Sequence, residues 1–211
     1  MRDFEQQFSQ FIQLQHASDA AHDLQHVLRV VKSAKQLCRD EAAIADVVVP
    51  AAWLHDCVSL AKDHPQRDQA SRLAADKAIE FLAQISYPPR HFSAIHHAIV
   101  AHSFSAKVTP HTIEAQIVQD ADRLDALGAI GIVRCIQVGN SLQRTLYSLD
   151  DPFCQQRLPD DTQFTLDHCY QKLLGLSDTM CTAAGRLEAH KRSEVMRAFL
   201  QQLAREIEPQ L

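Results

Sequence analysis

Apolar residues recur at intervals of three and four along most of this chain, a spacing typical of α-helices that bury one face. Phe4, Phe8, Phe11 and Ile12 form the first such stripe. The sequence predicts further helices over residues 18–38, 41–58, 69–85, 89–102, 110–128, 131–138, 165–174 and 178–208. We therefore expect an all-α protein, a helical bundle whose remaining residues form connecting loops.

Residues 41–58 are apolar on almost every side, which is typical of a helix buried in the centre of a bundle. The valine run within this range would also fit a buried strand, but its length and the alanines after it favour a helix, kinked at Pro50. We also expect a short, buried helix over 131–138. Residues 139–162 have the weakest periodicity, and we interpret them as an irregular excursion that covers the active site.

The composition limits the class of protein. The chain has 211 residues, which fits one domain, and only 5 glycines, which argues against glycine-rich nucleotide loops. The net charge of −5 and the lack of a basic block argue against nucleic-acid binding. No signal peptide or run of about 20 apolar residues is visible, so we expect a cytoplasmic protein without membrane contact. Its 6 cysteines form no C-x-x-C pair. We interpret them as reduced core thiols, with a cysteine nucleophile as the alternative.

Histidine is abundant, at 12 residues, and some of these histidines stand where metal ligands would be expected. His22 and His26 are four residues apart and share a helix face, although such a pair is also common on exposed surfaces. His55 and Asp56 end the most apolar predicted helix. An ionised aspartate buried there needs a cation, which is either a metal ion or a basic side chain.

A third acidic segment contains Asp120, Asp122 and Asp125. If Ala121 and Leu124 face the core, these acids point to different sides of the helix and cannot all serve one site. A solvated charged face is the alternative. Taken together, one histidine, the His55-Asp56 pair and one aspartate from this segment would supply four ligands to a divalent metal from three helices.

The order of these residues resembles the H…HD…D signature of the HD-domain metal-dependent phosphohydrolases. The blocks that carry the resemblance span nearly the whole chain, namely HDLQHVLRVV, AAWLHDCV, IVAHSFS, IEAQIVQDADRLDALGAIGIVR and FTLDHCYQKLLGL. The resemblance assigns the metal ligands as His26, His55, Asp56 and Asp122. It leaves His22 and Asp120 as supporting or structural residues. It implies one HD domain over 1–211, with the metal-site core at about 18–140 and helices at about 163–208 packed on it.

The resemblance also implies an activity. Members of this branch cleave nucleoside triphosphates to monophosphate and pyrophosphate, with Asp56 orienting or deprotonating the water. A nucleoside monophosphate phosphatase and a non-catalytic nucleotide-binding module are the alternatives. One divalent ion is expected, and Mn, Fe, Ni, Co, Zn and Mg all remain open. A homodimer is also left open.

The same resemblance suggests further site residues. His102 would contact the departing phosphate or act as an acid. His96 and His97 resemble the extra histidines of two-metal members, but the chain is more similar to the single-metal branch. Cys57-Val58-Ser59 stands where some members carry acidic residues after His-Asp, which leaves the general base open. The remaining candidates for phosphate or substrate contact are Lys62, Arg123, Arg144, Tyr147, His168 and Lys172.

Overall fold

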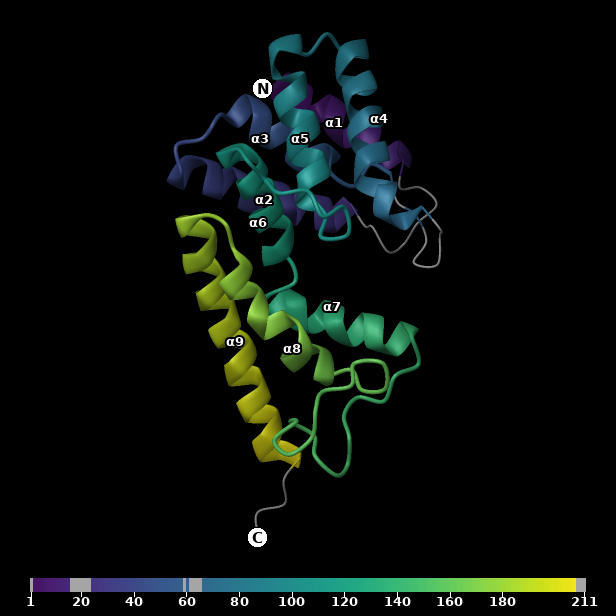
Figure 1. The fold of residues 1–211 in the computed structure, drawn as a ribbon, viewed down its shortest axis with the longest axis vertical. Helices are drawn as coiled ribbons and strands as arrows, with labels where there is room; N and C mark the ends of the chain where they lie inside the picture. Colours follow the sequence, from purple (N-terminus) through teal and green to yellow (C-terminus); the bar gives the residue numbers. More distant parts are fainter. Residues whose placement is uncertain (1, 16–23, 59, 61–65, 208–211) are drawn as a thin grey trace. The chain divides into compact units, whose positions relative to one another are not determined.

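The computed structural model describes residues 2–15, 24–58, 60 and 66–207 (Figure 1). The chain divides into two compact units, Met1–Asp122 and Arg123–Leu211. The predicted all-α class is confirmed, because the described residues form nine α-helices and no β-strand. A single isolated bridge joins Thr145 to Phe164. One domain over 1–211 stays a prediction.

The first unit is a bundle arranged around α3. Its helices are α1 (Arg2–Gln15), α2 (Leu24–Asp40), α3 (Ala45–Leu54), α4 (Ala70–Gln84), α5 (Phe92–His102) and most of α6 (Ile113–Leu124). Short 3-10 helices, Arg67–Gln69 and Pro89–His91, precede α4 and α5. The α3 helix packs against α1, α2, α4 and α5, and Figure 1 shows α4 and α5 side by side.

The central position of α3 follows from its sequence. All residues from Val47 to Leu54 are buried, which is the expected fate of a helix that is apolar all round. Pro50 lies inside this helix, as predicted. The predicted range of 41–58 was wrong at both ends, because α3 begins at Ala45 and ends at Leu54. At the start, Ala42 has a φ of 51°, a left-handed conformation that follows the end of α2. His55 and Asp56 therefore follow α3 in a turn rather than lying within it.

The second unit contains α7 (Gly128–Ser141), α8 (Asp167–Gln171), a 3-10 helix (Leu173–Thr179) and α9 (Ala183–Ile207). α9 packs on both α7 and the 3-10 helix. The prediction of a short, buried helix over 131–138 was wrong. α7 is longer and begins at Gly128, whose φ is 71°, and it leaves Val133, Ile136 and Val138 exposed by 49%, 39% and 42%.

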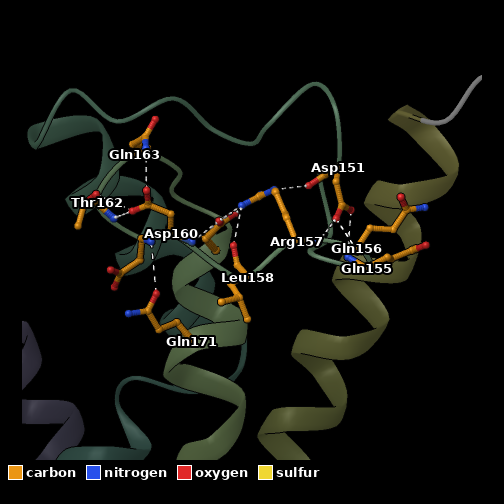
Figure 2. Close-up of polar contacts among 11 residues, drawn as sticks. Asp151, Gln155, Gln156, Arg157, Leu158, Asp160, Thr162, Gln163 and Gln171 are labelled. Carbon is orange, nitrogen blue, oxygen red and sulfur yellow. Dashed lines mark hydrogen bonds and ion pairs between the residues drawn. The ribbon is translucent and has the colours of Figure 1, made fainter.

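The predicted irregular excursion is present between α7 and α8, and polar contacts hold it together (Figure 2). The carboxylate of Asp151 accepts hydrogen bonds from the backbone N–H groups of Gln155, Gln156 and Arg157. The guanidinium of Arg157 binds both carboxylate oxygens of Asp167, which is completely buried. This part of the chain is thus ordered by side chains rather than by a regular backbone pattern.

No helix among the described residues is long and apolar enough to cross a membrane. All six cysteines are free thiols. Cys38, Cys57 and Cys169 are buried, whereas Cys135, Cys154 and Cys181 are partly exposed. The interpretation of all six as core thiols was therefore too broad.

Candidate metal centre

All four predicted ligands lie close together within the first unit, at the ends or edges of three helices. His26 lies on α2, His55 and Asp56 follow α3, and Asp122 lies near the end of α6. One ligand atom each from His26, His55 and Asp56 lies within 4.8 Å of the others. Oδ1 of Asp122 lies 3.4 Å from Nε2 of His26 and 3.9 Å from Nε2 of His55.

These separations suit donors that share one ion. Nε2 of His26 and Nε2 of His55 are 3.4 Å apart, and Oδ2 of Asp56 lies 3.8 Å and 3.6 Å from these two atoms. Two donors at about 2.1 Å from a tetrahedral ion would be about 3.4 Å apart. Imidazole nitrogens and carboxylate oxygens are also the donors that borderline divalent metals accept. The residues therefore fit a divalent ion.

His55 is held in the tautomer that a metal requires. Its Nδ1 lies 2.9 Å from the carbonyl oxygen of Ala52 and donates to it, which leaves Nε2 free of its proton and facing the cluster. The ring is completely buried, and this burial lowers its pKa despite the opposing charge of Asp56. His55 is therefore a neutral imidazole at neutral pH, which is the form that binds metals.

The two carboxylates stay ionised. Burial raises the pKa of Asp56, but the neighbouring His55, His102 and His26 outweigh it and hold that pKa well below its usual value. For Asp122, burial is likewise outweighed by the hydrogen bond and charge of His26, and the pKa falls to about 2. Both side chains therefore carry a negative charge toward the cluster at neutral pH.

His102, at the end of α5, borders the group on one side. Its Nε2 lies 3.5 Å from Oδ1 of Asp56, and its ring meets that of His55 edge to face with centroids 4.9 Å apart. Nδ1 of His102 donates to the carbonyl of Ile99 at 2.6 Å. Burial lowers the pKa of His102, but the hydrogen bond and charge of Asp56 outweigh it, so that this pKa is raised.

Gln119 supports the site, a role that was not predicted from the sequence. Its side chain is buried, and Nε2 donates to the carbonyl of Ala101 at 2.7 Å. This bond joins α6 to the end of α5. Its acceptor, Ala101, directly precedes His102, and its donor, Gln119, lies three residues before Asp122 on α6. The signal available in the sequence was a polar residue on the apolar face of a predicted helix, which is a weak one.

The acidic residues of the third segment do point to different sides, as expected. Asp122 is partly exposed and faces the histidines, whereas Asp120 is completely buried. Asp125, in the second unit, is also buried and accepts a hydrogen bond of 2.6 Å from Nη1 of Arg134. The three carboxylates thus have three different surroundings.

The extra histidines have other contacts. Nε2 of His96 lies 2.9 Å from Oδ1 of Asp76, and both side chains are exposed. Nε2 of His97 accepts a hydrogen bond from the backbone N–H of His111. Within the described ranges, the one group of three histidine, cysteine or acidic side chains that could share an ion is His26, His55 and Asp56.

The remaining candidates lie outside this group. Lys62 and His22 fall outside the described residues. Arg123 donates through Nη1 to the carbonyl of Thr179, and Nδ1 of His168 lies 2.6 Å from Oδ2 of Asp161. Lys172 is exposed, and Arg144 and Tyr147 are partly exposed. These five belong to the second unit, and their contact with a substrate stays a prediction.

Known proteins that are similar to this chain support its resemblance to the HD-domain proteins. The HD-domain family model matches residues 23–127. The YpgQ protein of Bacillus subtilis is 30% identical over 192 residues, which covers 89% of this chain and 85% of that protein.

Solved structures are similar over almost the whole chain. An HD-superfamily hydrolase from Bacillus thuringiensis has a TM-score of 0.78 at 30% identity and covers 99% of both chains. The structure of Bacillus subtilis YpgQ in complex with ADP has a TM-score of 0.74 at 29% identity, over 96% of this chain and 98% of that one. With its H…HD…D residues gathered in one group, this chain belongs to the HD-domain superfamily of metal-dependent hydrolases.

Proposed function

We propose that this protein hydrolyses ribo- or deoxynucleoside triphosphates to the monophosphate and pyrophosphate. The observation that carries the proposal is the group formed by His26, His55 and Asp56, which could hold one metal ion, with Oδ1 of Asp122 within 3.9 Å of both histidine Nε2 atoms. The proposed ligands are one nitrogen from each histidine and one oxygen from each aspartate. Mn, Fe, Ni, Co, Zn and Mg are all candidates for the ion, because mixed imidazole and carboxylate ligation suits several divalent metals.

A divalent ion held by these residues would supply Lewis acidity toward a phosphoryl oxygen and toward a water molecule. The protein's own groups would position that water. Oδ2 of Asp56 faces His26 and His55, while Oδ1 faces His102. We propose that Oδ2 of Asp56 binds the ion, and that Oδ1, which lies beside His102, orients the water or accepts its proton.

His102 is suited to hold a proton beside the reacting phosphate. Its Nδ1 is committed to the Ile99 carbonyl, so a second proton would reside on Nε2, next to Oδ1 of Asp56. From Nε2 the proton would pass to the departing phosphate oxygen, or it would neutralise the charge that develops there.

The nucleotide part of the proposal is supported by a relative. Bacillus subtilis YpgQ, 29% identical in the structural comparison, was crystallised in complex with ADP. For this chain we propose that Lys62, Arg123, Arg144 and Lys172 neutralise phosphate charge, and that Tyr147 and His168 contact the substrate. Phosphoryl transfer depends mainly on such positioning and charge neutralisation.

The test is a product assay with a panel of ribo- and deoxynucleoside triphosphates and Mn²⁺, in which pyrophosphate and phosphate are measured separately. Pyrophosphate together with the matching monophosphate supports the proposal. Phosphate alone, from triphosphates or from monophosphates, would instead assign a phosphatase. A tightly bound metal without turnover of any nucleotide would contradict the hydrolase and favour a nucleotide-binding module.

A further inference from the structure

The second unit brings two cysteines together across the excursion between α7 and α8. Cys135 lies on α7, and its Sγ donates to the carbonyl oxygen of Thr165 at 3.4 Å. Cys169 lies on α8, four residues after Thr165. In this turn the N–H of His168 bonds to Thr165 and the N–H of Cys169 to Leu166. This helical spacing turns Cys169 to the side on which Cys135 contacts Thr165, and each thiol is the main cause of the shift in the other's pKa.

The two thiols differ in exposure and in acidity. Cys135 is partly exposed, whereas Cys169 is buried, with 3% of its surface exposed. The neighbouring Cys169 thiol lowers the pKa of Cys135, with a further contribution from Arg144 that burial opposes. The neighbouring Cys135, together with burial, raises the pKa of Cys169. A partly exposed thiol whose pKa is lowered thus lies beside a buried thiol, an arrangement typical of redox-active pairs.

The chain's other thiols provide a contrast. Cys38 and Cys57 are buried, and like Cys135 each donates to a backbone carbonyl, that of Ala43 or Ala74. Burial raises the pKa of Cys57 to about 12 and that of Cys154 to about 11. These thiols are mostly protonated at neutral pH, and a protonated thiol is a poor nucleophile toward an oxidant.

We propose that Cys135 and Cys169 form a reversible disulfide when the protein meets hydrogen peroxide. The Cys135 thiolate attacks one peroxide oxygen, the O–O bond breaks, and Cys135 becomes a sulfenic acid with release of hydroxide. The Cys169 sulfur then attacks the Cys135 sulfur and loses its proton, and water leaves as the S–S bond forms. The two sulfurs together lose two electrons, which the peroxide gains, and a dithiol restores both thiols.

This bond would link the two ends of the irregular excursion. It closes a loop over residues 135–169, which contains the Asp151 contacts drawn in Figure 2 and the Arg157–Asp167 pair. A crosslink that fits the native geometry stabilises the protein chiefly by restricting the unfolded chain. Oxidised protein should therefore melt about 5 °C or more above reduced protein. The proposed disulfide and its effect on the melting temperature do not depend on the proposed hydrolysis.

The test uses the full-length protein, fully reduced and then exposed to an equimolar amount of hydrogen peroxide. Trypsin releases Cys135 within residues 135–144 and Cys169 within residues 158–172, and each of these peptides contains one cysteine. Non-reducing mass spectrometry should find the two peptides joined, two hydrogens lighter than their sum, and separated again by dithiothreitol. The Cys154→Ser variant, which alters another partly exposed thiol of the same unit, should retain the link.

The Cys169→Ser variant tests the order of the two steps. Without its partner, the sulfenic acid of Cys135 should persist and react with dimedone, and Cys135 should carry most of the label. Oxidation that links Cys135 to a different cysteine, or that modifies Cys154 or Cys181 without joining the two peptides, would overturn the proposal. So would an oxidised protein that carries the link but melts below the reduced one, because the bond would then distort the native structure.

Discussion

Nε2 of His102 lies 3.5 Å from Oδ1 of Asp56, while the other ring nitrogen of His102 donates to the carbonyl of Ile99. This pairing joins the end of α5 to the turn after α3. It also divides the Asp56 carboxylate between two tasks, since Oδ2 faces His26 and His55. We infer that His102 serves the reaction without being a ligand of the ion.

The His102→Gln variant should separate these two roles. The amide keeps a polar contact to Asp56 but cannot carry the second proton, so hydrolysis should fall by about 100-fold or more. Metal content, measured on the same preparation by elemental analysis, should remain that of the unchanged protein. If the variant loses the metal together with the activity, His102 acts as a ligand and this assignment is wrong.

Asp122 and Asp120 offer a matched pair on one helix. Asp122→Ala removes a proposed ligand from a partly exposed position, so metal affinity should fall by about 100-fold or more, with little change in stability. Asp120 is completely buried, and removal of a buried carboxylate that has polar partners should lower the free energy of unfolding by about 1–3 kcal/mol. Metal titration and urea unfolding of both variants test this. Loss of metal affinity in the Asp120 variant and loss of stability in the Asp122 variant would instead make Asp120 the ligand.

The sequence predicted the convergence of these residues only in part. Helical spacing alone left His22 and His26 open, and also Asp120 and Asp122. The resemblance to the HD-domain proteins selected His26 and Asp122, and the structure places both beside His55. The reason is that a helix repeat fixes which residues share a face, but it does not determine which face another helix will meet.

Other features had no clear signal in the sequence. The end of α2 depends on Ala42 in a left-handed conformation, a position where glycine is the usual marker. The apolar residues of α7 read as a buried helix, yet Val133 is 49% exposed, because an apolar stripe does not specify its partner. Arg157 and Asp167 pair across ten residues of irregular chain, and no periodicity predicts such a contact.

The Arg157–Asp167 pair should make stability depend on pH. Burial raises the pKa of Asp167, but hydrogen bonds from Arg157 and from the N–H of Asp160 outweigh it and lower that pKa. The folded state therefore binds this proton less readily than the unfolded chain, whose aspartates titrate near about pH 3.9. The stabilisation is present above that pH and is lost as the pH falls through the lower value of the folded state.

Asp167→Asn should accordingly lower the free energy of unfolding at pH 7 by about 3 kcal/mol, because it leaves Arg157 without its ionic partner. The difference from the unchanged protein should shrink as the pH is reduced from 5 to 3. Urea titrations across this range measure it, with Asp150→Asn, an exposed neighbour in the same excursion, as the control. A difference that stays constant with pH would show that Asp167 does not stabilise through its charge.

Gly139 marks a close approach between α7 and Thr165. A Cβ atom at this position would lie 2.2 Å from Oγ1 of Thr165, whereas a Cβ at Gly175 would have no heavy atom within 4 Å. Gly139→Ala should therefore destabilise the protein by about 1–3 kcal/mol through overpacking. Gly175→Ala, the control, should change stability by less than about 1 kcal/mol. Equal thermal midpoints for the two variants would show that Thr165 can move away from position 139 without loss of stability.

The most direct test of the central claim measures metal content and nucleotide hydrolysis on the same preparations of three proteins. These are the unchanged chain, Asp56→Ala, and Asp76→Ala, which alters the exposed aspartate paired with His96. We expect one Mn²⁺ per chain and pyrophosphate release from the unchanged protein and from Asp76→Ala. Asp56→Ala should remain folded and lose both. Pyrophosphate release by metal-free protein, or full metal content and activity in Asp56→Ala, would contradict the assignment of this group as the catalytic metal centre.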